Sequence, residues 1–147
     1  MMSRQQVVSK PYSYPLRKSR IKMPLVKVRV AVSNLQTGRM VSFEETCRID
    51  TGFDSDLFVP EYHISEAQSV GVTPSSSNIT LADGQKVPTR ICLGHITNIN
   101  GFVFPQPGIE VLLYLRGNPP YGFLGLGVLK SWLVKLDGPK QCFDVYC

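Results

Sequence analysis

The feature that most constrains this chain is hydrophobic alternation with a period of two, repeated in short segments along most of its length. Val26, Val28, Val30 and Val32 share one face of a predicted strand. A second alternation runs through 41–49, where Glu45 alone interrupts the apolar face, at a bulge or an exposed end. Many short strands separated by turn residues predict an all-β barrel or sandwich. Further predicted strand segments lie at 57–59, 79–81, 91–96, 109–115, 133–136 and 141–146.

Helix signals are few. One short helix is predicted over 61–70, with Pro60 near its start and Gly71 at its C-terminal cap. A second brief helix is expected from about residue 126. The pair Asp83–Gly84 predicts a two-residue hairpin turn, because both positions tolerate positive φ.

Composition supports a folded single domain. Hydrophobic residues make up 43% of the chain and charged residues 18%, which argues against disorder over most of its 147 residues. No stretch approaches eighteen uninterrupted apolar residues, so we expect no membrane-spanning helix and no membrane partner. The first residues lack the apolar core of a secretory signal, which leads us to expect a cytoplasmic protein.

Basic charge gathers at one end of the chain. Residues 1–24 carry six basic side chains and no acidic one, whereas the other 123 residues carry ten basic and eleven acidic side chains. We expect residues 1–24 to form a flexible, solvated arm. A basic arm is also able to touch nucleic acid, but the body of the chain is nearly neutral and shows no run of aromatic and basic residues, which disfavours a nucleic-acid partner.

The potential metal ligands are poorly spaced. Cysteines 47, 92, 142 and 147 form no C-x-x-C pair, and His63 and His95 are far from them in sequence. We therefore expect no metal and no cofactor. Both histidines are expected to be surface or capping groups, while Cys47 and Cys92 fall within apolar alternation and are expected to pack as small hydrophobic side chains.

The motif with chemical potential is Asp50-Thr51-Gly52, at the end of a predicted strand. A glycine after the aspartate lets the backbone turn tightly and approach a ligand closely. An Asp-Thr-Gly sequence is also an ordinary turn in which the aspartate caps backbone amides, so the three residues alone leave both interpretations open.

Their context resembles the active-site segment of retropepsin-like aspartic proteases. Asp50 to Phe53 follows an apolar alternation and precedes Leu57-Phe58-Val59-Pro60. Downstream, the Asp83–Gly84 hairpin stands where that family has its flap, and Phe123-Leu124-Gly125 resembles the segment that braces the catalytic loop. The closing segment 136–139 resembles small bacterial and archaeal members, so the likeness covers residues 25–147.

The resemblance implies a closed acid-protease-like β-barrel with one or two short helices, and an aspartic endopeptidase without a cofactor. Asp50 would be catalytic, Thr51 and Gly52 would support the catalytic loop, and Leu124 and Gly125 would brace it. Substrate would contact the residues after the motif and at the flap tip, namely Phe53, Asp54, Ala82, Asp83, Gly84 and Gln85.

Departures from the retroviral type are informative. Phe53 replaces a small residue and would line the substrate cleft or the core beneath it. Leu126 and Gly127 stand where the retroviral enzymes carry an arginine and a polar residue, so the buried ion pair of those enzymes is absent here.

Catalysis of this type needs two carboxyl groups, and the chain has one Asp-Thr-Gly. We therefore expect a homodimer in which each subunit supplies Asp50 and which hydrolyses a polypeptide substrate. The terminal strand 141–147 is expected to be either a dimer element or an intramolecular strand. The alternative function is a catalytically inactive protease-like module for peptide binding or assembly, with Phe53 blocking the cleft.

Overall fold

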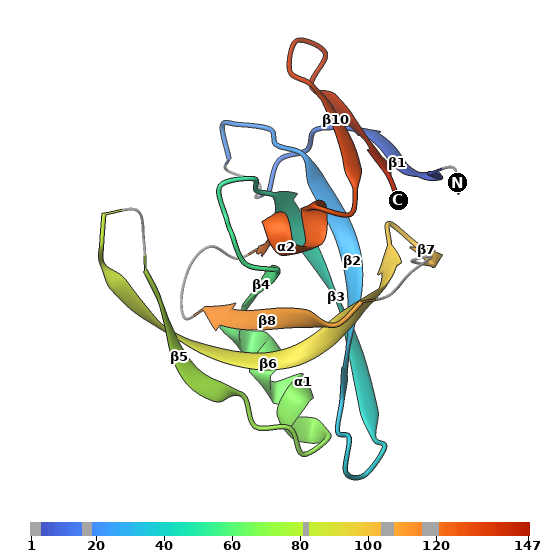
Figure 1. Cartoon of the computed structure of the whole chain (residues 1–147). Helices are drawn as coiled ribbons and strands as arrows, with labels where there is room; N and C mark the ends of the chain where they lie inside the picture. Colours follow the sequence, from blue (N-terminus) through green and yellow to red (C-terminus); the bar gives the residue numbers. More distant parts are fainter. Residues whose placement is uncertain (1–3, 16–18, 81–82, 104–107, 116–120) are drawn as a thin grey trace.

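The computed structural model describes residues 4–15, 19–80, 83–103, 108–115 and 121–147. In this part of the chain, strands dominate and two short α-helices accompany them (Figure 1). The predicted all-β class is therefore confirmed. The central strands are β2 (Leu25–Ser33), β3 (Met40–Ile49), β4 (Leu57–Pro60), β6 (Lys86–Ile99), β8 (Glu110–Leu115) and β9 (Gly122–Leu124).

These six strands close into a barrel. The hydrogen-bonded order is β2-β3-β9-β4-β8-β6, and pairing of β2 with β6 closes the circle. Two neighbouring pairs, β3 with β9 and β4 with β8, are parallel, and the other pairs are antiparallel. β5 (Ser75–Thr80) and the two-residue β7 (Phe102–Val103) pair with β6 outside the barrel path.

The barrel interior is filled by the apolar face that the alternation predicts. Val26, Val28, Val30 and Val32 of β2 are fully buried, as are Leu112 of β8 and other members of one hydrophobic cluster. Burying a valine side chain contributes roughly 1.5–3 kcal/mol relative to leaving it exposed. The alternating face of β2 therefore supplies much of the favourable free energy that closes the barrel.

The N-terminal segment differs from the expectation of a flexible arm. Residues Gln6–Pro11 form β1, which pairs antiparallel with β11 (Cys142–Tyr146), and β11 in turn pairs with β10 (Leu133–Asp137). Val7 and Val8 are buried in the hydrophobic cluster. The expectation is wrong for this segment because charge counting overlooked two adjacent valines that gain free energy by burial.

The terminal strand β11 lies between β1 and β10 of the same subunit. The intramolecular alternative therefore describes this strand. Both of its edges are occupied, so a second subunit has no free edge of β11 to pair with.

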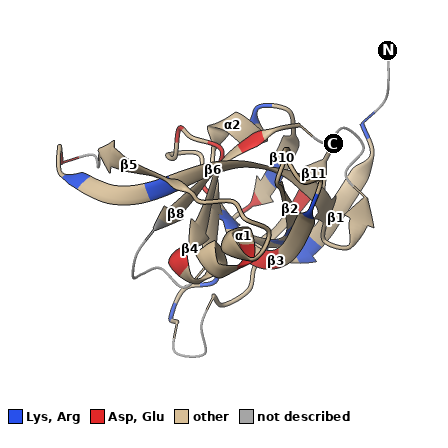
Figure 2. Ribbon diagram, turned by 90° about the horizontal axis from the view of Figure 1, so that it is seen from below, with Lys and Arg blue, Asp and Glu red and all other residues tan. Residues whose placement is uncertain are grey.

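Figure 2 shows that Lys and Arg positions occur both on the β5–β6 hairpin and on the side that carries β1, with Asp and Glu positions between them.

The helices are where the sequence places them. A 3₁₀ turn, η1 (Glu61–His63), leads into α1 (Ile64–Ser69), and Gly71 after it has a φ of +80°. The second helix, α2 (Leu126–Leu129), begins directly after Gly125. Among the described residues, no helix is long and apolar enough to cross a membrane.

Candidate active site

Asp50 lies immediately after β3, in a loop that its own carboxylate helps to shape. The Asp50 N–H donates to the Leu124 carbonyl at 2.9 Å, which continues the β3–β9 pairing by one residue. Asp50 Oδ1 accepts the Gly52 N–H at 3.0 Å. The side chain is 24% exposed, so the carboxylate is held by the backbone and remains accessible from outside the barrel.

The segment after β9 holds this loop from the other side. Leu124 is fully buried, and the Gly125 N–H donates to the Asp56 carbonyl at 2.8 Å. A Cβ at position 125 would collide with the Ser55 carbonyl oxygen and with Phe53. Only glycine allows this close approach. Leu124 and Gly125 therefore contact the Asp50 loop directly, as their expected bracing role requires.

Asp56 ties the far end of the same loop to the barrel. Its Oδ2 accepts the Val111 N–H at 2.8 Å, and its Oδ1 lies where a Cβ at Gly127 would stand. The Gly127 N–H donates to the Ser55 carbonyl at 3.1 Å. Glycine at position 127 thus leaves space for the Asp56 side chain, which accepts a backbone N–H. This hydrogen bond holds the loop in place of the arginine ion pair expected in retroviral enzymes.

Arg48 is a charged neighbour of Asp50 that sequence reasoning missed. Its Nη2 donates to Asp50 Oδ2 at 2.7 Å, and its guanidinium carbon lies 4.6 Å from the centre of the Phe123 ring. The signal was present in the sequence, because residues two apart in extended chain point to the same side, and Asp50 directly follows the strand that holds Arg48.

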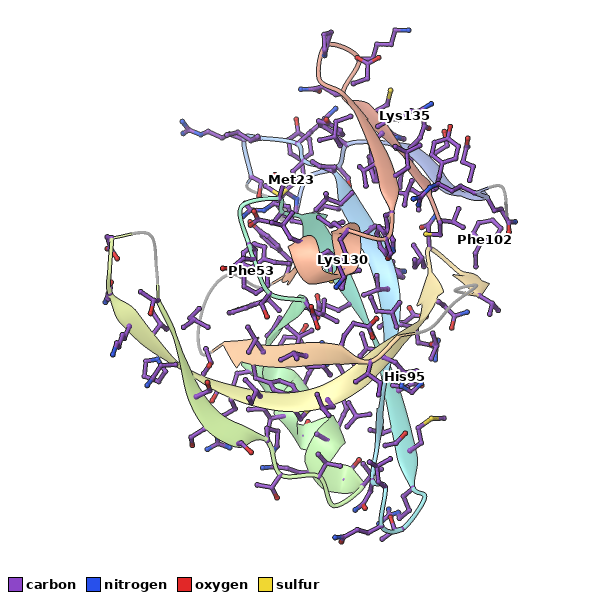
Figure 3. The ribbon with its side chains drawn as sticks, viewed as in Figure 1. Met23, Phe53, His95, Phe102, Lys130 and Lys135 are labelled. Atoms are coloured by element: carbon purple, nitrogen blue, oxygen red, sulfur yellow. The ribbon has the colours of Figure 1, made fainter. Side chains whose placement is uncertain are left out.

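Phe53 packs at the base of the loop. Its ring meets Phe58 edge to face at a centroid distance of 5.6 Å, and Phe58 lies 5.6 Å from Phe123. Phe53 is half-buried and touches the position of Gly125. In Figure 3 it lies beside α2. The Phe53 ring therefore packs partly into the core, which is one of the two places expected for it. Asp54 beside it is exposed.

The predicted hairpin is present, with a longer connection than expected. The paired strands end at Thr80 and Lys86, so five residues separate them instead of a two-residue turn. Asp83, Gly84 and Gln85 are exposed, the Gln85 N–H donates to Asp83 Oδ1 at 2.9 Å, and Gly84 has a φ of +87°. Ala82, also expected at the tip, lies outside the described residues.

An apolar surface adjoins the Asp50 loop. Thr51 lies at the edge of an open pocket of about 230 Å³ that is mainly lined by side chains of α2 and β10. Leu126 and Leu136, which line it, are among the exposed large hydrophobic residues of the chain. We name Thr51, Leu126, Val134 and Leu136 the apolar patch.

A second charged cluster lies on the opposite face of β3. Glu45 Oε2 accepts from the Tyr62 hydroxyl at 2.8 Å and lies 2.6 Å from His63 Nε2, while His63 Nδ1 lies 2.6 Å from Glu66 Oε2. The His63 ring stacks on Phe43 at 4.0 Å. The expectations of a surface His63 and of Glu45 at a bulge or exposed end are wrong, since both are buried.

The contacts of this buried cluster explain its titration. Burial alone would lower the pKa of His63, but hydrogen bonds and charge from Glu45 and Glu66 outweigh it and raise that pKa above its ordinary value. The sequence signal was an acidic residue at an inward position of a strand, with histidine and glutamate three residues apart downstream. An inward acid needs a buried partner, which the first helical turn supplies.

His95 takes no part in either cluster. Figure 3 shows it on β6, well separated from Phe53. All four cysteines are free, with Cys47 fully buried and Cys92 half-buried, which confirms their apolar packing. In the described ranges, no three His, Cys, Asp or Glu side chains are grouped so that they could hold a metal ion.

Comparison with solved structures finds a similar chain, a retropepsin-like aspartic protease from Rickettsia conorii. The two chains are 12% identical, and the match has a TM-score of 0.43 and covers 86% of this chain and 96% of that chain. No family model and no curated protein matches the sequence. The function of this chain therefore has to be argued from its own residues.

Proposed function

We propose that this chain is an aspartic endopeptidase that works as a homodimer and hydrolyses polypeptides between two Asp50 carboxyl groups. The observation that carries the proposal is the setting of Asp50. Its Oδ1 accepts the Gly52 N–H, its Oδ2 pairs with Arg48, its loop is fixed to β9 through Leu124, and the side chain is partly exposed. Such fixing is what an acid–base group needs before substrate arrives.

The chemistry follows from placing two such groups about 3 Å apart. Like charges at that distance cannot both persist, so the pair shares one proton. The ionised Asp50 takes a proton from water, which attacks the peptide carbonyl, and the protonated Asp50 hydrogen-bonds the carbonyl oxygen and then protonates the leaving amine. No covalent enzyme intermediate forms in this sequence of steps.

The apolar patch supports association of two subunits on this face. Leu126 is 44% exposed and Leu136 is 53% exposed, directly beside Thr51. Burying both leucines against a second subunit would remove unfavourable apolar surface from water and bring the Asp50 loops together. In that dimer Thr51 hydroxyl groups would link the two loops, as the family resemblance implies.

The exposed tip of the β5–β6 hairpin supports a flap. Asp83, Gly84 and Gln85 would close over an extended peptide bound by strand-like hydrogen bonds, with Ala82 as part of the same tip. Phe53 and Asp54 would line the substrate cleft at the loop. We expect the body, residues 25–147, to act as the protease domain.

The Arg48–Asp50 ion pair favours a second candidate, a dimeric module that binds peptide without cleaving it. In that case Asp50 stays paired with Arg48 and serves only to hold the loop. A statine-type transition-state mimic separates the two functions, because a working carboxyl pair binds such a mimic far more tightly than substrate. Weak binding, equal to that of an ordinary peptide, would favour the module.

The decisive experiment combines cleavage and solution mass. Asp50→Asn should abolish cleavage of an unfolded polypeptide and leave the dimer mass unchanged. Asp144→Asn is the matched control, because it makes the same chemical change on β11, outside the Asp50 loop. Cleavage that persists in Asp50→Asn, or a strictly monomeric wild-type chain, would remove the proposal, since one carboxyl group lacks its partner acid.

A further inference from the structure

The cation beside Asp50 is the least expected feature of the site. Arg48 on β3 makes a 2.7 Å contact with Asp50, which directly follows that strand, and the proposed function puts the scissile bond at the Asp50 carboxyl groups. A side chain on the substrate next to that bond would therefore pass close to Arg48. An arginine at this place is well suited to recognising that side chain.

The guanidinium is positioned but far from saturated. Cross-strand pairing sets Arg48 opposite Phe123, and the 4.6 Å cation–π contact holds its plane against the ring. Asp50 is its single hydrogen-bond partner among the described residues. Guanidinium has five N–H donors, so most of them stay available, and the side chain is 34% exposed.

Among the described residues, neither Asp54 nor Asp56 of the same loop forms an ion pair with Arg48. Asp54 is exposed and makes no ion pair among the described residues, and Asp56 is occupied by the Val111 N–H. In the proposed dimer the two Asp50 groups share one proton and carry a single negative charge, while two Arg48 groups bring two positive charges. These four side chains taken together then carry one excess positive charge.

We propose that Arg48 is a specificity-determining residue that selects polypeptides with an aspartate or glutamate next to the cleaved bond. This inference rests on the proposed peptidase function. The substrate carboxylate accepts hydrogen bonds from the free N–H groups of Arg48, which can bind it in a bidentate manner, and its negative charge balances the excess positive charge. The substrate carboxylate also offers Arg48 a partner other than Asp50. Asp50 is then available to share a proton with Asp50 of the second subunit.

Two measurements test this selection. Wild type first cleaves a library of unstructured peptides at about pH 6, where glutamate is ionised, and the residues flanking each cut are identified by mass spectrometry. Then a pair of peptides that differ only in Glu or Gln beside the cut is compared. We expect kcat/KM to favour the Glu peptide about tenfold or more, the effect of one charged hydrogen bond.

Arg48→Met keeps the aliphatic stem over Phe123 and removes the charge. It should bring the Glu-to-Gln ratio to about one, and because the ratio is taken within one enzyme, a partial loss of folded protein cancels. Arg29→Met is the matched control, since Arg29 on β2 makes an equally short pair with Glu44, 2.7 Å, away from the Asp50 loop. It should keep the wild-type ratio.

Binding supplies a readout that needs no turnover. In Asp50→Asn, Arg48 loses its internal carboxylate, so a fluorescent Glu peptide should bind more tightly than its Gln twin, and the added Arg48→Met change should erase the difference. Wild-type cleavage with no acidic preference, or a preference that survives Arg48→Met, overturns the selection alone. No cleavage by wild type overturns the peptidase function, and equal binding of both peptides by Asp50→Asn then overturns the selection as well.

Discussion

Two side-chain groups lie on opposite faces of β3: Glu45 of the strand with His63 of η1, and Arg48 of the strand with Asp50, which follows it. Their surroundings differ sharply. Toward the barrel, the buried side chains of Glu45 and His63 contact each other, and Glu66 and the Tyr62 hydroxyl complete the cluster from a more exposed position. Away from the barrel, Asp50 and Arg48 form one hydrogen-bonded pair that is a quarter to a third exposed. The first arrangement uses its hydrogen-bonding capacity internally, so it suits stability. The second leaves capacity unused, so it suits chemistry.

Asp50→Asn is expected to separate activity from stability most strongly. The substitution removes both carboxyl groups of the proposed pair, one from each subunit, and should lower kcat by about a thousandfold or more. The urea midpoint should stay close to that of wild type, because the asparagine side chain retains a carbonyl oxygen for the Gly52 N–H. A large loss of stability alongside the loss of activity would mean that Asp50 is a structural residue like Glu45.

Whereas Asp50→Asn lowers activity, His63→Leu is expected to lower stability strongly. It leaves the buried Glu45 without its imidazole partner, and breaking one side of a buried ion pair costs about 3–5 kcal/mol. Urea denaturation measures that loss in the free energy of unfolding. Glu66→Gln is the matched control, because Glu66 is partly exposed and its loss should cost clearly less. Equal costs would contradict the idea that burial makes this cluster structural.

Glu110 offers a third test of how burial acts on a carboxyl group. Burial first, and then the charge of Asp56, raise its pKa to about 7, although the Ile96 N–H bonded to Oε2 at 2.9 Å opposes this. The folded state therefore holds the proton more tightly than the unfolded state, and stability falls as pH rises from about 4.5 to about 7. Glu110→Gln should stabilise the chain by about 1–3 kcal/mol at about pH 8 and little at about pH 4. Unchanged unfolding at the higher pH would contradict this.

The stability contributed by the Glu45–His63 cluster should fall as pH rises, whereas the stability contributed by a carboxylate with a lowered pKa rises with pH. The pKa of His63 is raised in the folded state, so its contribution is fully present below the unfolded value of about 6.5. That contribution is lost as pH rises through the folded pKa. The urea midpoint of Glu110→Gln, which removes the Glu110 titration, should fall as pH rises above about 6.5. Adding His63→Gln should flatten the curve, and a slope that persists would assign it to another group.

The strands were predictable because each carries its own local signal. The valines of β2 recur at every second position, and Gly38 and Gly71 in the turns have the positive φ that glycine tolerates. β1 was missed because its two-residue apolar pair is too short to stand out from its basic neighbours. Its partner, β11, lies at the other end of the chain, and such distant pairing leaves no local signal.

The candidate site divides in the same way. Asp50, Thr51 and Gly52 were predicted from one short motif and Gly125 from the family resemblance, and the structure brings these residues together. Arg48 was overlooked because a basic residue on the outer face of a strand is normally solvated. Glu45 and His63 were misplaced because their pairing crosses from β3 to a helical turn eighteen residues away. The contacts that depend on tertiary packing were the ones that sequence patterns did not reveal.

Arg48→Met completes the comparison with the smallest expected effect on stability. The Arg48–Asp50 pair is partly exposed, so water and salt screen it, and removing it should lower the free energy of unfolding by no more than about 1 kcal/mol. The Phe123 contact persists in part through the retained stem. Urea unfolding of Arg48→Met and Arg29→Met should therefore give similar small losses, even though only Arg48→Met changes substrate preference. A loss as large as that of His63→Leu would show that Arg48 holds the loop together, and the contrast between the two faces of β3 would then disappear.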